Sequence, residues 1–284
     1  MKPISLRQRK RRSAAHPTTG SAWVRWLLCG AALVVVSALL VVPLIAVFVS
    51  AFSAGLPTYF KNISHPDTVS AIELTLLTAA IAVPLNAAFG IVAAWLIAKF
   101  DFWGKQLLVT IIDLPFSVSP VVSGLLFVLL FGRQGWFGPW LSEHDIRIIF
   151  AVPGIVLATV FVTFPFVARE VLALLQTQDS NGEEAALTLG ASAWQMFWHV
   201  TLPKAKWSIL YGTILCNARA MGEFGAVSVV SGHIRGMTNT MPLHVEILYN
   251  EYNFAGAFTT ASVLAMLAVV TLILKRVVEW RSAR

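Results

Sequence analysis

Two charged residues stand out because they lie within a long apolar stretch of the C-terminal third of the chain. Arg219 and Glu223 are four residues apart, so a helix would carry both on one face. At 1.5 Å per residue, Arg219 lies roughly 18 Å along such a helix from Trp207. In a membrane, charges at that depth are costly and must face the protein interior. The pair is either an internal ion pair that holds its helix to a neighbour or a positive charge beside an anion route.

Hydroxyl side chains gather around Pro120 in an earlier apolar stretch. Pro120 must interrupt the hydrogen bonds of a helix, and a broken helix exposes backbone N–H groups. Backbone amides and hydroxyls together suit a tetrahedral oxyanion without a full positive charge. The alternative is ordinary packing of helices through small residues. The hydroxyl candidates for the lining of an anion pathway are Ser117, Ser119, Ser123 and Ser228.

The other reactive side chains are poorly placed for catalysis. All six histidines are expected in tails or loops, so a histidine-based metal or nucleophilic site at membrane depth is disfavoured. The Gly-x-x-x-x-Gly-Lys phosphate loop is missing, because Lys99 stands where the first glycine would precede Gly104 and Lys105. Cys29 and Cys216 lie in apolar surroundings and predict no disulfide. The sequence therefore predicts no enzyme, no ATPase activity, and no metal or cofactor in this chain.

Membrane helices are the elements that must position these residues. Of the 284 residues, 57% are hydrophobic and 12% are charged, and the mean hydropathy is +0.74. A soluble domain of this length could not bury so much apolar surface. About 20 apolar helical residues cross the hydrocarbon of a bilayer. We predict a single all-α membrane domain over residues 23–280, with six spans at residues 26–50, 74–98, 107–132, 148–172, 207–231 and 252–275.

The distribution of Lys and Arg predicts the orientation of these spans, because positive charges near span ends stay on the cytoplasmic side. If both termini are cytoplasmic, 16 of the 21 Lys and Arg residues face the cytoplasm. Only four face outside, namely Lys61, Arg133, Arg147 and Arg235. We therefore predict a disordered basic tail over residues 1–22 and a cytoplasmic C-terminus over residues 281–284. The net charge of +7 fits contact with anionic lipid and needs no nucleic acid.

The connection between the fourth and fifth predicted spans is cytoplasmic in this topology, and its sequence EEAALTLGASAWQMFWHVTLP is unusually ordered for a loop. Glu183 and Glu184 suit the first turn of a helix, where carboxylates interact favourably with the helix dipole, and Gly190 is expected to end that helix. Ser192 and Gln195 form a Ser-x-x-Gln capping box for a second helix. Two short helices bent at Gly190 are predicted.

The connection covers residues 179–206, and its second helix carries an aromatic stripe. Trp194, Phe197, Trp198 and Leu202 recur at helical spacing, and Pro203 is expected to break the chain before the fifth span. A stripe of this kind lies in the lipid headgroups, packs on the protein's own helix bundle, or docks in the groove of a partner.

The same connection matches a known pattern. Glu184-Ala185-Ala186, then Gly190, then Val200-Thr201-Leu202-Pro203 match the EAA-x3-G-x9-I-x-L-P loop of ABC importer permeases, with Val200 in place of Ile. Longer segments, such as IIDLPFSVSPVVSGLLF and NARAMGEFGAVSVVSGHIRG, resemble the W-type permease subunit of bacterial sulfate/thiosulfate importers. The resemblance extends from Trp26 to Trp280.

This resemblance implies the type I ABC importer permease fold and a place in the bacterial inner membrane. The implied partners are a second, T-type permease, two ATPase subunits that bind ATP and Mg²⁺, and a periplasmic sulfate/thiosulfate-binding protein. The loop would then be a pair of coupling helices docked on an ATPase subunit. Its implied coupling residues are Glu183, Glu184, Ala185, Ala186, Gly190, Trp194, Phe197, Leu202 and Pro203.

Two alternatives remain. A permease for another oxyanion, such as molybdate, would have the same architecture, because hydroxyls and one arginine do not select among oxyanions. A secondary transporter or channel would explain the intramembrane Arg219 and Glu223, but it would not explain the EAA-type loop.

Overall fold

The computed structural model describes residues 22–179 and 181–282. The predicted basic tail, apart from its last residue, lies outside the described residues, as do Ser180 and the last two residues of the chain. The described part of the chain is helical and contains no strand, so the all-α fold class is confirmed. The chain divides into two compact units, residues 1–46 and 47–284.

The first unit consists, in its described part, of one apolar helix that continues into the second unit. α1 (Ala22–Val36) passes through a π-helical turn, η1 (Ser37–Val41), into α2 (Val42–Phe52). The continuous helix Trp23–Phe52 is long and apolar enough to cross a membrane, in agreement with the first predicted span.

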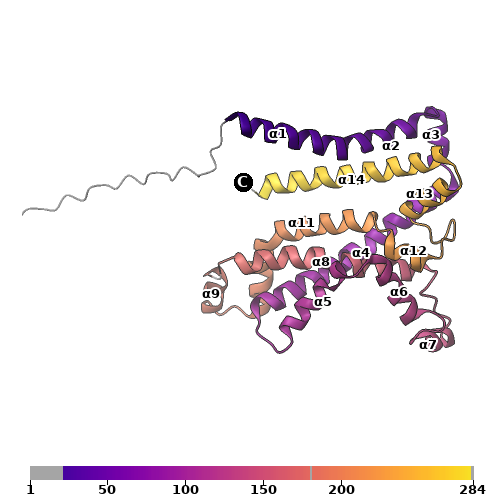
Figure 1. The fold of residues 1–284 in the computed structure, drawn as a ribbon. Helices are drawn as coiled ribbons and strands as arrows, with labels where there is room; N and C mark the ends of the chain where they lie inside the picture. Colours follow the sequence, from indigo (N-terminus) through magenta and orange to yellow (C-terminus); the bar gives the residue numbers. More distant parts are fainter. Residues whose placement is uncertain (1–21, 180, 283–284) are drawn as a thin grey trace, which may run out of the picture. The chain divides into compact units, whose positions relative to one another are not determined.

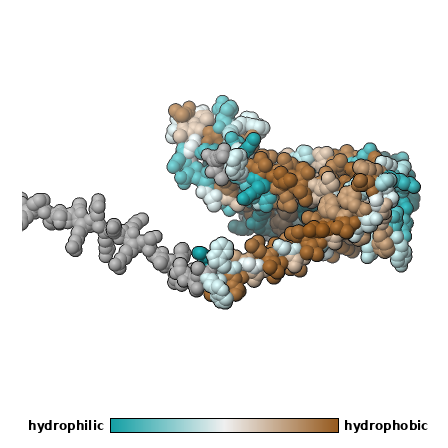
Figure 2. Space-filling model, turned by 90° about the horizontal axis from the view of Figure 1, so that it is seen from above, coloured by the Kyte–Doolittle hydropathy of each residue, from teal (hydrophilic) through white to brown (hydrophobic). Residues whose placement is uncertain are grey.

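The second unit contains the remaining helices, which Figure 1 shows in chain order. In that figure α4, α8 and α11 lie side by side, and these three helices pack on one another. Hydrophobic residues gather along the lengths of the helices and hydrophilic residues at their ends (Figure 2). Their bounds are α3 (Leu56–Ile63), α4 (Pro66–Lys99), α5 (Lys105–Ser117), α6 (Pro120–Phe131), α7 (Gly138–Glu143), α8 (Val152–Thr177), α9 (Asn181–Thr188), α10 (Ala193–Met196), η2 (Phe197–Thr201), α11 (Leu202–Met221), α12 (Gly225–Ser231), α13 (Met241–Asn250) and α14 (Phe254–Ser282).

Four described helices are suited by length and composition to cross a membrane, or five if α5 and α6 count as one bent span. The second, fourth and sixth predicted spans correspond to α4, α8 and α14. α8 begins four residues later than predicted, because residues 148–151 form a turn. In that turn Phe150 has a left-handed backbone, with φ 61°, and its N–H donates to the carbonyl of Val230 at 2.8 Å.

The third predicted span is broken where the sequence places Pro120. α5 and α6 meet at an angle of 112° across this break. Val118 and Ser119 are extended there, with ψ 133° and 136°. Crowding by the proline ring favours an extended backbone in the preceding residue, which explains the sharp end of the helix. The predicted interruption at Pro120 is confirmed.

The fifth predicted span was expected to be one helix, and this is wrong. α11 ends at Met221 with Gly222 as its C-cap, and α12 begins only at Gly225. The two broken spans adjoin each other, since a Cβ added to Gly225 would lie 2.9 Å from the Cβ of Pro120. The chain breaks of α5–α6 and α11–α12 therefore lie against each other inside the second unit.

A buried polar network joins the three central helices. Asn86 of α4 is fully buried, and its amide donates to Thr163 Oγ1 at 2.7 Å and to the carbonyl of Val160 at 3.2 Å, both on α8. The same amide lies 3.6 Å from Cys216 Sγ on α11. In an apolar environment, such hydrogen bonds and close packing of small residues hold helices together.

One histidine is placed differently from the sequence prediction. His244 lies on α13 rather than in a loop, and it is buried against the first turn of α4, where its Nε2 lies 3.2 Å from Thr68 Oγ1. Burial lowers the pKa of His244, because desolvation penalises the charged imidazolium. No local sequence pattern indicates this contact, which joins residues 176 positions apart.

Gly90 allows the close approach of α4 to α8. A Cβ at Gly90 would lie 2.9 Å from the backbone nitrogen of Ala168 and 3.0 Å from the Cβ of Val167. We predict that Gly90→Val destabilises the protein by about 1–3 kcal/mol through overpacking, measured as a lower thermal unfolding midpoint in detergent. Gly30→Val is the matched control, because a Cβ at Gly30 would meet nothing within 4 Å. Equal midpoints for the two variants would contradict the tight α4–α8 contact.

Candidate functional site

The first helix of the connection between α8 and α11 ends in a left-handed glycine, as predicted. Gly190 follows α9 with φ +86°, a conformation that disfavours residues with a Cβ. Its N–H donates to the carbonyl of Leu187 at 3.0 Å, and the N–H of Ala191 donates to the carbonyl of Ala186 at 3.0 Å. These two bonds form a Schellman motif, which satisfies the last carbonyls of α9 and turns the chain sharply.

The predicted capping box is present at the start of the second helix. The backbone N–H of Gln195 donates to Ser192 Oγ at 3.3 Å, and the N–H of Ser192 donates to Gln195 Oε1 at 2.9 Å. The prediction that Pro203 ends this helix is wrong. α10 continues through the π-helical turn η2 into α11, and Pro203 occupies one of the first two positions of α11. The N–H of Leu202 donates to the carbonyl of Phe197, five residues back, so the hydrogen-bond register has already shifted where the proline lacks an N–H.

A buried ion pair anchors the connection to the helix bundle. Lys99, the last residue of α4, places its Nζ 2.5 Å from Glu183 Oε2 on α9. The hydroxyl of Thr201 in η2 donates to the other oxygen, Glu183 Oε1, at 2.8 Å. Glu183 is only 7% exposed. One carboxylate thus joins the end of α4 to both halves of the connection.

The aromatic stripe divides between the bundle and the surface. Phe197 is buried and lies against Trp95 of α4, with ring centroids 4.7 Å apart. Trp194 contacts Phe197 from outside at 5.8 Å and stays 64% exposed. Packing on the bundle therefore explains Phe197 but not Trp194. The exposed residues of the connection include Glu184, Ala185, Leu187, Leu189, Trp194, Trp198 and Pro203, whereas Ala186 and Leu202 are half-buried.

Arg219 and Glu223 form an ion pair, although they do not share a helix. The Nη1 of Arg219, in the last turn of α11, lies 2.6 Å from Glu223 Oε2. The expectation of a shared helical face is wrong, because Glu223 lies in the break before α12. The side chain of Glu223 is 1% exposed, and its Oε1 accepts the N–H of Ala226 at 2.9 Å. Glu223 therefore stabilises the first turn of α12 as well as pairing with Arg219.

The four hydroxyl candidates fall into two groups. Ser123 is buried and donates to the carbonyl of Ser119 at 3.2 Å, and Ser228 donates to the carbonyl of Gly225 at 2.8 Å. These two hydroxyls are used within their own helices. Ser117 and Ser119 are exposed beside the α5–α6 break. The structure brings all four near the adjoining breaks, with α6 packed on α12.

Sequence reasoning missed Lys99 and Trp95, which lie outside the connection and contact it. No local pattern identifies them, since they lie 84 and 102 positions from their partners Glu183 and Phe197.

Near Lys99, on the surface, the hydrogen bond and charge of Lys105 lower the pKa of Asp101. In the described part of the chain, no group of His, Cys, Asp and Glu side chains is arranged to hold a metal ion.

Comparison with known proteins identifies the family. A family model described as "Binding-protein-dependent transport system inner membrane component" matches residues 86–284. The chain belongs to this family of transport permeases. The permease is 52% identical to the sulfate transport system permease protein CysW of Escherichia coli (strain K12), over 91% of this chain and 89% of CysW. It is 35% identical to CysT of the same organism, over 87% of this chain and 89% of CysT. The resemblance to W-type permeases is confirmed.

The fold of the permease is also found among solved structures. A chain of a bacterial ABC transporter involved in the import of the acidic polysaccharide alginate matches with a TM-score of 0.75 and 19% identity. The match covers 92% of this chain and 96% of that one. At this identity the likeness shows the fold alone, which is the predicted type I ABC importer permease fold. The relatives are transport permeases, in agreement with the prediction of a chain that is not an enzyme.

The geometry of Arg219 and Glu223 predicts the outcome of a double-mutant test. Arg219→Gln alone leaves the buried carboxylate of Glu223 without its partner, at a cost of about 3–5 kcal/mol, whereas Glu223→Gln leaves an arginine that is 34% exposed and should be milder. We expect the double variant to unfold at a higher temperature than Arg219→Gln with Glu223 intact, and to recover anion uptake together with stability. The measurements are the unfolding midpoint and uptake by the assembled complex. A double variant that assembles normally but transports no anion would show that Arg219 acts on the anion.

Proposed function

We propose that this permease is one subunit of an ATP-driven importer of sulfate and thiosulfate in the bacterial inner membrane. The observation that carries the proposal is the 52% identity to CysW over 91% of the chain, against 35% to CysT. A CysT-like permease would be its partner in a heterodimer. A periplasmic sulfate/thiosulfate-binding protein would deliver the anion, and two ATPase subunits would bind ATP and Mg²⁺.

The cytoplasmic connection supports a coupling role. Its exposed surface carries Leu189, which is 88% exposed, and Trp194, and exposed apolar side chains of this kind fit the docking of an ATPase subunit. Behind that surface, Glu183 ties α9 to Lys99 at the end of α4. Closure of the ATPase subunits around ATP would push the connection and α4 together, and so turn the pathway from inward-facing to outward-facing.

The proposed topology has six spans with both termini cytoplasmic. It counts α5 with α6 as one bent span and α11 with α12 as another. α11 alone has 20 residues, about the length needed to cross the hydrocarbon. The strong excess of Lys and Arg on one side of this arrangement supports the orientation.

The proposed anion pathway passes the adjoining breaks of α5–α6 and α11–α12. Discontinuous helices expose backbone amides at membrane depth, where they line a polar cavity rather than contact lipid. The candidate hydroxyls are Ser117, Ser119, Ser123 and Ser228, and the ion pair of Arg219 with Glu223 lies beside them.

An importer of molybdate is the alternative function. Uptake of labelled sulfate in cells with the gene deleted and restored, in competition with thiosulfate and molybdate, tests the proposal; uptake unaffected by deletion would exclude it.

The coupling role predicts the response of Gly190 to substitution. No atom lies within 4 Å of a Cβ at Gly190, so a loss of function there reports the backbone bend rather than a clash. We expect Gly190→Val to reduce ATP-driven sulfate uptake about tenfold or more while the protein still inserts, because a β-branched residue is strained at this φ. Gly190→Asn should retain most uptake, since asparagine tolerates a left-handed backbone. Full uptake by Gly190→Val would refute the coupling assignment.

The topology predicts which cysteines an impermeant thiol reagent can label in intact cells. Met237 is 68% exposed, and its position between α12 and α13 is expected outside. Asn239 in the same segment is unsuitable because it is buried. On a Cys29→Ser background, we expect Met237→Cys to be labelled from outside and Asp101→Cys only after the cells are opened. Cys216 is buried and should stay silent. The reverse pattern would exclude this orientation.

A further inference from the structure

One face of α5 carries polar side chains along the length of the helix. Gln106, Thr110, Asp113 and Ser117 are spaced four, three and four residues apart, which places them on the same side of a helix. We call these four residues the polar stripe. The side chain of Asp113 is 28% exposed, and the other three residues are exposed. The stripe extends about 16 Å along α5 and ends beside the break at Pro120.

The remaining faces of α5 are apolar. Ile112 and Pro115 are buried, and Ile112 lies in the core that α5 shares with α8. Leu107, Ile111 and Leu114 form a third face, and all three are exposed. Hydrocarbon or an apolar partner suits this third face, whereas polar groups at membrane depth must meet protein or water. The two exposed faces of α5 therefore require different surroundings.

An ion pair joins the polar stripe to α8. Arg169 of α8 donates from Nε to Asp113 Oδ1 at 2.5 Å and from Nη2 to Oδ2 of the same carboxylate. Asp113 lies eight residues from the start of α5 and Arg169 eight residues from the end of α8, which is about 12 Å along each helix. Both of these helix ends are cytoplasmic in the proposed topology. The pair therefore lies in the cytoplasmic half of the membrane.

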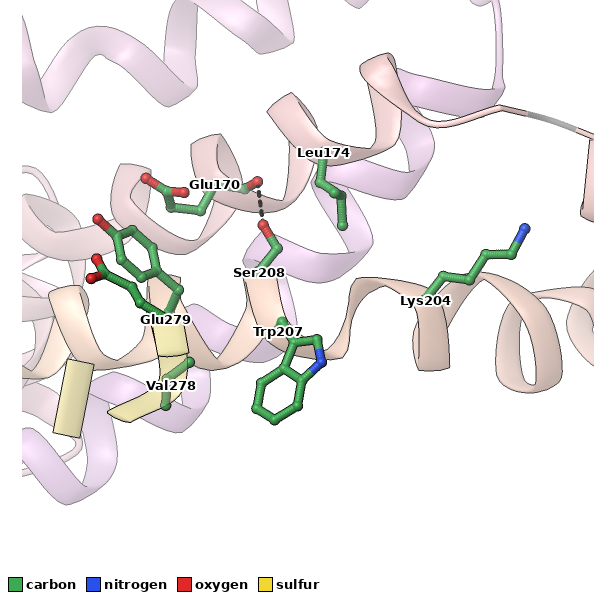
Figure 3. Close-up of a pocket in the computed structure, with 8 residues that line it drawn as sticks. Glu170, Leu174, Lys204, Trp207, Ser208, Val278 and Glu279 are labelled. Atoms are coloured by element: carbon green, nitrogen blue, oxygen red, sulfur yellow. Dashed lines mark hydrogen bonds between the residues drawn. The ribbon is translucent and has the colours of Figure 1, made fainter. Parts of the chain in front are cut away.

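The contact with Asp113 leaves one edge of the Arg169 guanidinium unused. Within the described residues, Nη1 and the second N–H of Nη2 bond to no acceptor, and the side chain is 49% exposed. The neighbouring carboxylate of Glu170 is directed elsewhere. Figure 3 shows Glu170 in the pocket that α8 forms with α11 and α14, where its backbone carbonyl accepts from Ser208 Oγ at 2.8 Å. Arg169 thus has Asp113 as its counter-charge and keeps two parallel N–H groups for another acceptor.

We propose that the polar stripe and Arg169 line the cytoplasmic half of the anion pathway, and that Arg169 binds the anion there. This inference deepens the proposed function and rests on it. The ligand is a tetrahedral oxyanion, because two parallel N–H groups of a guanidinium match two oxygens of such an anion. Asp113 is a positioning residue. It orients the guanidinium and offsets its charge, so that the anion binds weakly enough to be released into the cytoplasm.

Cysteine labelling in inside-out membrane vesicles tests the position of the stripe. The vesicles hold the full complex without ATP, the permease carries Cys29→Ser, and the probe is a small, negatively charged methanethiosulfonate. Thr110→Cys lies on the stripe, and Ile111→Cys is its matched control at the same depth on the apolar face. We expect Thr110→Cys to react about tenfold faster, because apolar surroundings suppress the reactive thiolate. Equal rates for the two cysteines would overturn the proposal, as they would if the second permease covered the stripe.

Protection from labelling by the anion tests Arg169. Potassium sulfate should slow the labelling of Thr110→Cys, whereas potassium chloride at the same ionic strength should not. Arg169→Gln should lose this protection. The double variant Arg169→Gln with Asp113→Asn should lose it as well, because removal of the unpaired carboxylate does not replace the N–H donors. Protection that returned in the double variant would show that Arg169 only neutralises Asp113, and anion binding by Arg169 would be refuted.

Asp113→Asn alone is an independent variant if Arg169→Gln fails to assemble. It keeps the guanidinium and removes the counter-charge, so about tenfold less sulfate should give the same protection. Asp101→Asn is the matched control, because it removes a carboxylate from an exposed ion pair with Lys105 outside the stripe. An unchanged sulfate dependence in Asp113→Asn would contradict the role of Asp113. Because labelling is measured without ATP, failure of the proposed import would appear separately, as absent uptake with the labelling pattern intact.

Discussion

The buried ion pair of Glu183 with Lys99 is the interaction on which the connection between α8 and α11 depends. The carboxylate accepts from Lys99 at the end of α4 and from Thr201 in η2, so three segments distant in sequence meet at one side chain. Removing it would leave a largely buried ammonium group without a counter-charge, which costs several kcal/mol. With Glu183 in place, the connection is fixed to the bundle at a point between its two ends. A loop held in this way can transmit a push, whereas a loop tied only by its ends would bend.

The hydrocarbon imposes a second constraint, on the two helix breaks. Irregular backbone at membrane depth is tolerated only where protein or a polar cavity satisfies its N–H and carbonyl groups. The breaks meet this requirement by adjoining each other at Pro120 and Gly225. Glu223 supplies an acceptor for the first turn of α12 and is itself neutralised by Arg219. The ion pair and the break are therefore one structural feature.

Features that depend on local sequence could be predicted, and features that depend on distant contacts could not. The apolar helices, the bend at Gly190, the capping box and the interruption at Pro120 follow from neighbouring residues. The continuation of the helix from α10 through Pro203 into α11 could not be predicted, because it depends on a π-helical turn that changes the hydrogen-bond register. The contact of His244 with Thr68 and the network around Asn86 join residues 74 or more positions apart. The periodicity of apolar residues along the chain does not indicate such contacts.

The shared fold means that substrate selectivity must be sought in side chains. A chain of a bacterial ABC transporter involved in alginate import has the same fold at 19% identity, so the helix scaffold does not identify the transported molecule. Near the breaks, Arg219 is paired with Glu223, and Ser123 and Ser228 donate to their own helices. Ser117 and Ser119, exposed beside the break, are the hydroxyls in this group whose protons are not engaged in the described structure. An anion passing here would meet neutral donors rather than a full positive charge, and weak binding of this kind suits a pathway that must also release its substrate.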